Sequence, residues 1–384
     1  MKIVTNLPRL LLGFSAVVLF CSCGGTDVNE PYLSVNSDPG DGAEVNQVSA
    51  ELQTIGLAGA ESDADQTTSG MAPFLVGDGV MDQAVGTIDP SSWGELMSGG
   101  GVLLSMVDLG EEPRRPLRLS PSVGQVESLT FEMAMNMGMS MGSEPLVMMD
   151  TPDVTFTIES ELMSLGDDGL LSLRWSCTGV EVSEGVGLMA GQEELMDAEM
   201  RGLVGLSGFH TINSLGYPVS SSMSFADHLL LESPQLLEQL KSVEGILDGA
   251  GFVLPGLEVG AGASWETLRE VENNGFSFLV HQVVSLTELN DSEVTFSVTT
   301  TQALGDSAPQ IPNLPLGAEV EVTSLTSSGT GLITLVEGMM NSKHVQTDLD
   351  MSIEMQVTGL APEAMHMALQ NQTGLKVTTI ILAE

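Results

Sequence analysis

Cysteine is scarce in this sequence, and its scarcity excludes a fold held by disulfide bonds. Cys21 and Cys23 lie within the first 25 residues, so Cys177 is the one cysteine further along the chain. A single internal cysteine has no intramolecular partner, even in an oxidising compartment. Because Cys177 ends the strand-like run 171–177, we predict a buried core thiol rather than a reactive one.

Basic residues are scarce as well: 11 Lys and Arg stand against 52 Asp and Glu. A surface this negative repels phosphate backbones, which excludes nucleic acid as a partner. It also argues against electrostatic adsorption to anionic lipid, so membrane residence would require a covalent anchor. Hydrophobic residues nevertheless make up 42% of the chain, which is enough for a large core.

The first 25 residues have the organisation of an export signal. Lys2 and Arg9 supply positive charge, and the apolar stretch 10–20 follows. That stretch is shorter than the roughly 20 residues that a membrane-spanning helix needs, and it has the length of a signal-peptide core. A small residue, Ser22, then precedes Cys23.

This segment resembles the lipobox of bacterial lipoproteins, in which a cysteine thiol takes a diacylglyceryl group and becomes the first residue. The resemblance implies that residues 1–22 are removed as a lipoprotein signal peptide and that Cys23 is lipidated. Gly24 in place of aspartate implies sorting to the outer membrane of the cell envelope. An ordinary cleaved signal with two incidental cysteines is the alternative.

Residues 23–112 differ in composition from the rest of the chain. From residue 26 to 112 there is no Lys or Arg, and Gly, Ser, Asp and Ala are abundant. Low hydrophobicity with uncompensated charge does not offset the entropy lost on ordering. We therefore predict a mostly disordered acidic tether over 23–112. Two apolar islands, 74–76 and 102–104, are expected to dock on the domain or on a partner.

Residues 113–384 show the pattern of a β-rich globular domain. Between Phe131 and Met141, apolar residues alternate with period two, which predicts a strand with five methionines on one face. These methionines are Met133, Met135, Met137, Met139 and Met141. Turn residues at 167–169, 290–291 and 327–329 separate further predicted strands. The other predicted strands are 154–158, 171–180, two within 201–225, 276–286, 294–301, 320–325, 332–336, 345–357 and 375–382.

One helix is predicted among these strands, at about 234–248. Ser233 is a suitable N-cap, and Pro234 stands at the first helical position. Leucines then recur at helical spacing, which indicates a face that packs on the sheet. The expected fold is mainly β (α+β): a large curved antiparallel sheet or open barrel of about 10–12 strands, with one principal covering helix.

The domain resembles a family of bacterial lipoproteins that is defined only as a domain of unknown function. The matching features are the run 117–125 before the methionine strand, the turn at 167–169, residues 257–260 with Trp265, and a hairpin from 328–331 to 337–338. The resemblance covers most of residues 114–384. It implies a shared fold and brings no activity, cofactor or catalytic residue.

No catalytic motif was found. The chain lacks the His-Glu-x-x-His zinc motif, and the one match to the Gly-x-Ser-x-Gly pattern, at 138–142, lies at the end of the predicted strand 131–141 rather than at a strand-to-helix turn. The five histidines are scattered without the spacing of metal ligands. We predict that the protein is not an enzyme and that it carries no cofactor apart from the diacylglyceryl anchor on Cys23.

Three functions remain as hypotheses. The first is binding of a lipid or other hydrophobic ligand in a cavity lined by the methionines of 133–141. The second is a structural or protein-interaction lipoprotein in which the same residues fill a solid core. The third is binding of Cu(I), for which thioether sulfurs are suitable ligands.

Overall fold

The computed structural model describes residues 74–76, 84–85, 87–92, 102–142, 145–166, 169–184, 193–224, 253–273, 276–305, 319–359 and 364–382. The predicted signal peptide 1–22, Cys23 and the predicted helix 234–248 lie outside these ranges. Those three predictions therefore stay predictions. Within the described ranges, no helix is long and apolar enough to cross a membrane.

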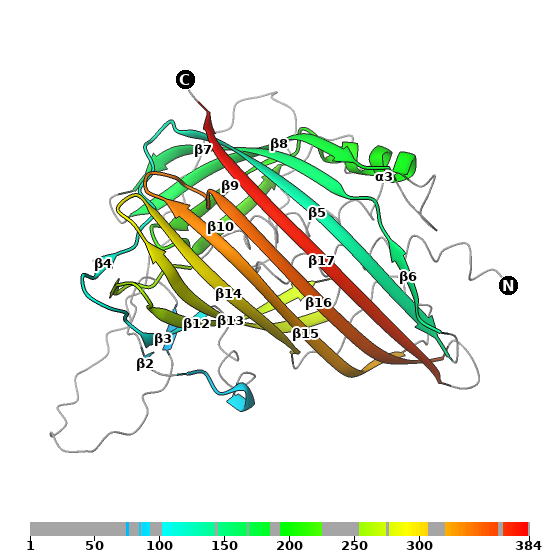
Figure 1. Ribbon diagram of the computed structural model, residues 1–384. Helices are drawn as coiled ribbons and strands as arrows, with labels where there is room; N and C mark the ends of the chain where they lie inside the picture. Colours follow the sequence, from blue (N-terminus) through cyan, green and yellow to red (C-terminus); the bar gives the residue numbers. More distant parts are fainter. Residues whose placement is uncertain are drawn as a thin grey trace, which may run out of the picture.

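A single large antiparallel sheet dominates the described structure, as the sequence predicted (Figure 1). It contains 15 strands, more than the expected 10–12, because short strands from residues before 113 and from 147–150 join it. The long strands are β5 (Val126–Met141), β7 (Val154–Leu165), β8 (Leu170–Val182), β12 (Ser264–Asn273), β13 (Phe276–Leu289), β14 (Glu293–Leu304), β15 (Glu319–Val336), β16 (His344–Thr358) and β17 (Met365–Leu382). The shorter ones are β1 (Phe74–Val76), β2 (Ala84–Val85), β3 (Val102–Asp108), β6 (Val147–Asp150), β9 (Ser207–Asn213) and β10 (Pro218–Ser224).

Most strands follow one another as hairpins, but the central pairing joins distant parts of the chain. The order is β1-β3-β12-β13-β14-β15-β16-β17-β5-β7-β8-β9-β10, with β2 beside β3 and β6 beside β5. The last strand, β17, pairs with the first long strand, β5, from Met367↔Met141 to Leu382↔Val126. Among the described strands, only β2 and β3 pair in parallel. A separate two-stranded sheet is formed by β4 (Arg115–Pro116) and β11 (Glu258–Val259).

The predicted turn at 327–329 is wrong, because β15 runs through it without interruption. Gly329 and Gly331 lie opposite Leu349 and Thr347 of β16. A Cβ atom on Gly329 would stand 2.9 Å from the Asp348 carbonyl oxygen, and one on Gly331 would stand 2.6 Å from Thr347 Cγ2. These glycines allow two strands to approach closely, and the chain reverses later, between β15 and β16.

Both apolar islands of the predicted tether are strands of the sheet. Residues 74–76 form β1, and 102–104 begin β3, which pairs with β12. Val102, Leu104 and Met106 are buried in the main core. Most of residues 23–112 lie outside the described ranges, so the prediction of a disordered tether stays a prediction.

The α-helix that the structure does describe, α3 (Glu193–Met200), was not predicted. It is short and buries Met196 against the same core.

The sheet is strongly curved and open (Figure 1), and the burial pattern of its strands shows that its two faces differ in polarity. In β16, for example, Leu349, Met351 and Ile353 are buried and face inward, whereas Asp348 and Asp350 alternate with them and are exposed. An apolar concave face and a polar convex face are what a curved sheet surrounded by water requires.

Contacts outside the strand ladders hold the curvature. Tyr217, at the turn before β10, donates a 2.7 Å hydrogen bond to the carbonyl oxygen of Val102 in β3. Trp265 of β12 donates one of 3.3 Å to Val253, and the Leu254 amide donates to Leu215. The two ends of the strand order thus meet around one apolar core, whose largest fully buried side chains include Trp265 and Phe131.

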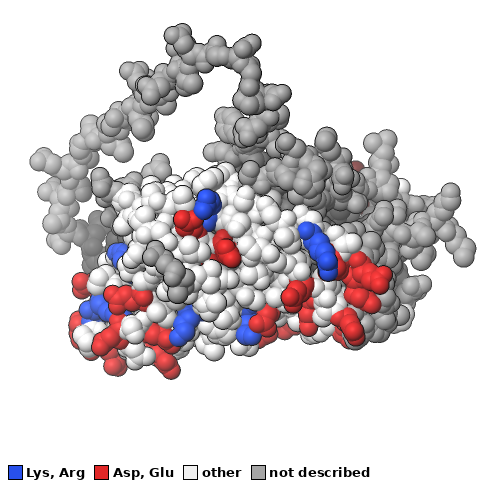
Figure 2. Space-filling view, turned by 90° about the horizontal axis from the view of Figure 1, so that it is seen from above, with Lys and Arg blue, Asp and Glu red and all other residues white. Residues whose placement is uncertain are grey.

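Several basic side chains on the outer surface pair with acidic ones. On the face shown in Figure 2, basic side chains are dispersed among acidic ones. Lys376 contacts Glu132 at 2.7 Å across β17 and β5, and Lys343 contacts Glu293 at 2.9 Å. Such exposed pairs contribute little to stability, on the order of 1 kcal/mol or less.

Candidate binding face on the concave side

The methionine strand lies at the centre of the sheet with its methionines on the concave face. Met133, Met135 and Met137 are buried, and Met139 is partly buried. The alternating residues Glu132, Ala134 and Asn136 are exposed on the convex face, whereas Gly138 is buried. The side chain of Met141 lies outside what the structure describes.

Beside these methionines the concave face is crossed by a band of polar residues, here called the polar belt. It consists of two successive rows of inward-facing residues, as the strand registers show. One row places Met135 next to Thr373 of β17, and the other places Met137 next to Asn371. The polar belt comprises Thr267, Arg269, Gln282, Thr300, Gln302, Ser327, Asn371 and Thr373.

Apolar clusters border the polar belt on both sides. On one side lies the main core, which includes Trp265, Phe296 and Leu375. On the other side lies a second cluster, built from β12, β13, β16 and β17. Its buried members are Val271, Phe276, Phe278, Val280, Leu349, Met351, Ile353, Met355 and Leu369. Along β14 and β17 the concave face is therefore apolar, then polar, then apolar, whereas β5 and β16 contribute methionine and leucine side chains to the same two rows.

Some polar atoms of the belt are hydrogen-bonded to one another. Ser327 donates to Gln302 Oε1 at 2.9 Å. Thr267 donates to Gln282 Oε1 at 3.4 Å, and Gln282 Nε2 donates to Thr300 Oγ1 at 3.5 Å. These last two contacts are long for hydrogen bonds.

Other polar atoms of the belt are buried and have no hydrogen-bond partner in the part of the chain that the structure describes. They are Gln302 Nε2, both amide atoms of Asn371, and Thr373 Oγ1. Asn371 and Thr373 are each 4% exposed, and Gln302 is 6% exposed. Buried polar atoms in native proteins are nearly always hydrogen-bonded, and leaving one unsatisfied costs about 1–3 kcal/mol. The belt thus offers several unsatisfied donors and acceptors in an apolar setting.

The periodicity of the sequence predicted the methionines of this face but not its polar residues. A signal does exist in β17, where inward-facing Leu369 and Leu375 are separated by Asn371 and Thr373. That interruption of an apolar face becomes visible only when the strand and its register are known.

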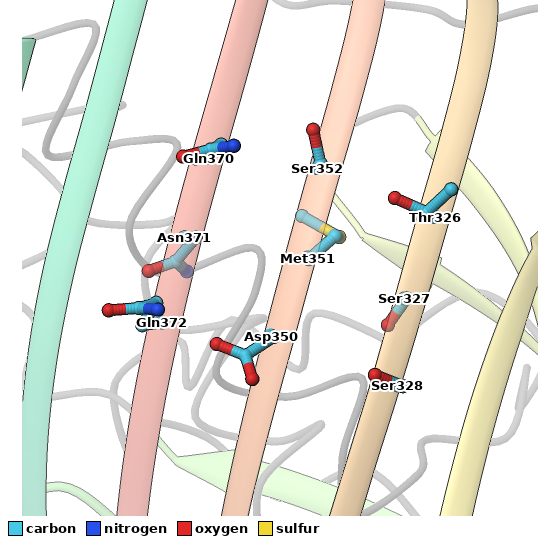
Figure 3. A pocket seen from close by; sticks show the side chains of 9 residues that line it. All are labelled: Thr326, Ser327, Ser328, Asp350, Met351, Ser352, Gln370, Asn371 and Gln372. Atoms are coloured by element: carbon cyan, nitrogen blue, oxygen red, sulfur yellow. The ribbon is translucent and has the colours of Figure 1, made fainter. Parts of the chain in front are cut away.

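A separate pocket of about 350 Å³ lies on the convex face of β15, β16 and β17 (Figure 3). Its outward side chains form two rows: Thr326, Ser352 and Gln370 in one, and Ser328, Asp350 and Gln372 in the other. Ser327, Met351 and Asn371 complete the lining from between these rows. The outward side chains are all polar, so this pocket does not suit an apolar ligand.

Cys177 is a buried free thiol in the main core. Burial raises the pKa of this thiol above its ordinary value. Among the described residues, no group of three or more His, Cys, Asp or Glu side chains could hold a metal ion. Binding of Cu(I) by the methionines is not tested by this observation and stays a prediction.

Comparisons with known proteins do not assign the chain to a family. No protein-family model and no curated protein matches it. Among solved structures, lipovitellin, described for its lipid–protein interactions, matches 68% of this chain and 25% of its own, with 11% identity and a TM-score of 0.35. The chain thus spans about a quarter of lipovitellin.

Two outer membrane proteins are also similar at low level. A channel from Pseudomonas putida F1 has 9% identity and a TM-score of 0.18, with 67% of this chain and 97% of its own covered. OmpT of Vibrio cholerae has 8% identity and a TM-score of 0.15, with 66% and 100% covered. Similarities this low support no argument about function.

Proposed function

We propose that this protein binds a lipid or another hydrophobic ligand on the concave face of its sheet. The observation that supports this most directly is the polar belt, which holds unsatisfied donors and acceptors at Asn371, Thr373 and Gln302 between two apolar clusters. Ligand sites combine mostly apolar walls with a few polar groups that fix orientation. The concave face has that composition.

The methionines suit such a ligand. Met135 and Met137 lie in the two rows of the belt, and Met351 lies beside Asn371 on the opposite strand. Methionine is unbranched and flexible, so it adapts to apolar partners of different shape. Each 100 Å² of apolar surface that a hydrocarbon chain buries there contributes roughly 2.5 kcal/mol before the costs of association.

The proposal includes a place in the cell envelope. The lipobox-like segment supports a diacylglyceryl anchor on Cys23 and residence at the outer membrane. Residues 23–112 would then connect the anchor to the sheet, with β1 and β3 as the points where this segment joins it. A ligand-binding protein held in this way stays close to a source of lipid.

The first test is native mass spectrometry of the full-length chain carrying Cys23→Ser, which removes the proposed lipidation site. The protein is produced in a bacterial periplasm and purified without detergent. We expect an added mass that is released on denaturation. A bare mass that stays unchanged after incubation with lipid extract contradicts the proposal and leaves a structural or protein-binding role.

Two neighbouring substitutions on β5 locate the site. Met137→Glu places a charge on the concave face, whereas Asn136→Glu places the same charge on the exposed convex face of the same strand. We expect the first to abolish the added mass and the second to leave it, with near-UV circular dichroism to show that both variants are folded. Equal loss in both variants would mean that the ligand does not occupy the concave face.

A further inference from the structure

Asn371 occupies an unusual place on the concave face. Its cross-strand neighbours are Met137 on β5 and Met351 on β16, so both of its flanks are apolar. The side chain is 4% exposed, and neither Nδ2 nor Oδ1 has a hydrogen-bond partner among the described residues. A primary amide presents donors at one end and an acceptor at the other. Both ends therefore stay unsatisfied whichever way the amide is oriented.

The surroundings of Asn371 favour a neutral group. From β5 to β14, its row consists of Met137, Asn371, Met351, Ser327 and Gln302, none of which is ionisable. The row reaches an ionisable residue only at Arg269 of β12, five strands from Asn371, so a charged headgroup beside Asn371 would be removed from water without an adjacent counter-charge. A neutral group that both donates and accepts hydrogen bonds satisfies Asn371 fully.

We infer that Asn371 binds the amide group of an N-acyl lipid, an inference that rests on the proposed function. The ligand carbonyl accepts from Nδ2, and the ligand N–H donates to Oδ1. An ester has the same shape but only acceptors, so it leaves Oδ1 unsatisfied. Of the two common linkages of an acyl chain, the amide is the one that matches this side chain.

The neighbouring residues accommodate the rest of such a ligand. On one side, the next row places Leu369 beside Met139 and Ile353, and Leu369 and Ile353 belong to the second apolar cluster, which suits the acyl chain. On the other side, Thr373 lies two residues along β17, about 7 Å away, and its Oγ1 has no partner. A hydroxyl close to the ligand amide would satisfy it.

The test compares two probes that differ in one position. N-palmitoylethanolamine and 2-hydroxyethyl palmitate share the acyl chain and the terminal hydroxyl, and they differ in having N–H or O in the linkage. Binding of each to the full-length Cys23→Ser chain is measured by isothermal titration calorimetry. We expect the amide to bind about tenfold more tightly, since the ester leaves one buried acceptor unsatisfied.

Two substitutions on β17 provide the matched comparison. Asn371→Leu keeps the size of the side chain and removes both polar atoms, so the preference for the amide should fall to about onefold. Gln372→Leu makes the same kind of change one residue further, on the exposed convex face, and should leave the preference intact. Asn371→Ala serves as a second variant, and thermal unfolding shows that each chain is folded.

The outcomes separate the two proposals. Equal affinity of the native chain for both probes overturns the assignment of an amide and leaves the proposed function standing. Binding of neither probe overturns the inference, and it overturns the proposed function only if the lipid-extract experiment also leaves a bare mass. If the preference for the amide over the ester persists in the Asn371 variants, another residue distinguishes the two linkages and the inference is overturned.

Discussion

Glu127 provides the sharpest test of how this sheet is held together. Its side chain is 0% exposed at the start of β5, and its carboxylate accepts four hydrogen bonds. Gln125 Nε2 and the Met340 amide donate to Oε1, both at 2.7 Å. The amide and Nδ2 of Asn341 donate to Oε2, at 3.0 and 2.9 Å. The carboxylate therefore ties β5 to the β15–β16 connection, more than 200 residues away.

The informative perturbation is Glu127→Gln, which preserves the shape and turns one acceptor atom into a donor. Whichever way the new amide is oriented, its nitrogen faces two donors, so two hydrogen bonds to a charged group are lost. At about 2 kcal/mol for each such bond, the free energy of unfolding should fall by about 4 kcal/mol. Urea titration followed by circular dichroism measures this change.

The control is Glu132→Gln, the same substitution on the same strand. Glu132 is about half exposed and paired with Lys376, so its replacement should cost less than about 1 kcal/mol. If the two variants lose the same free energy of unfolding, the buried carboxylate is not what fastens the connection to β5. The reasoning would then be refuted.

Two other variants test the core and the curvature. Burial raises the pKa of Cys177, so at pH 8 it holds less thiolate than a free cysteine. The test uses a chain in which Cys21 and Cys23 are replaced by serine, so that only Cys177 can react with iodoacetamide. The reaction should be at least about tenfold slower with the folded protein than with the urea-unfolded protein, and its rate should increase as the pH rises. Equal rates for the folded and unfolded protein would contradict a buried thiol. Tyr217→Phe removes the buried hydrogen bond to Val102 and should lower the free energy of unfolding by about 1–2 kcal/mol in the same urea assay; an unchanged value would mean that this bond does not hold the ends of the sheet together.

The local pattern of the sequence determined much of the strand content. Alternation from Phe131 to Met141 predicted β5 and the face on which its methionines lie, and Asn290-Asp291 correctly separated β13 from β14. Both inferences depend on neighbours in sequence, where a period of two directly reports a shared face. The turn predicted at Ser327-Ser328-Gly329 was wrong for the same reason. Its local composition is that of a turn, whereas in the structure Gly329 lies within β15 and allows β16 to approach closely.

The polar belt was decided by the tertiary structure alone. Asn371 and Met137 are neighbours because β17 pairs with β5 in one particular register, and a shift by one residue would turn Asn371 to the convex face. Periodicity determines which residues of one strand share a face, but it carries no information on the register between strands far apart in the chain. The sequence by itself therefore determined that this protein is built from amphipathic strands, whereas long-range pairing decided where its unsatisfied polar groups meet.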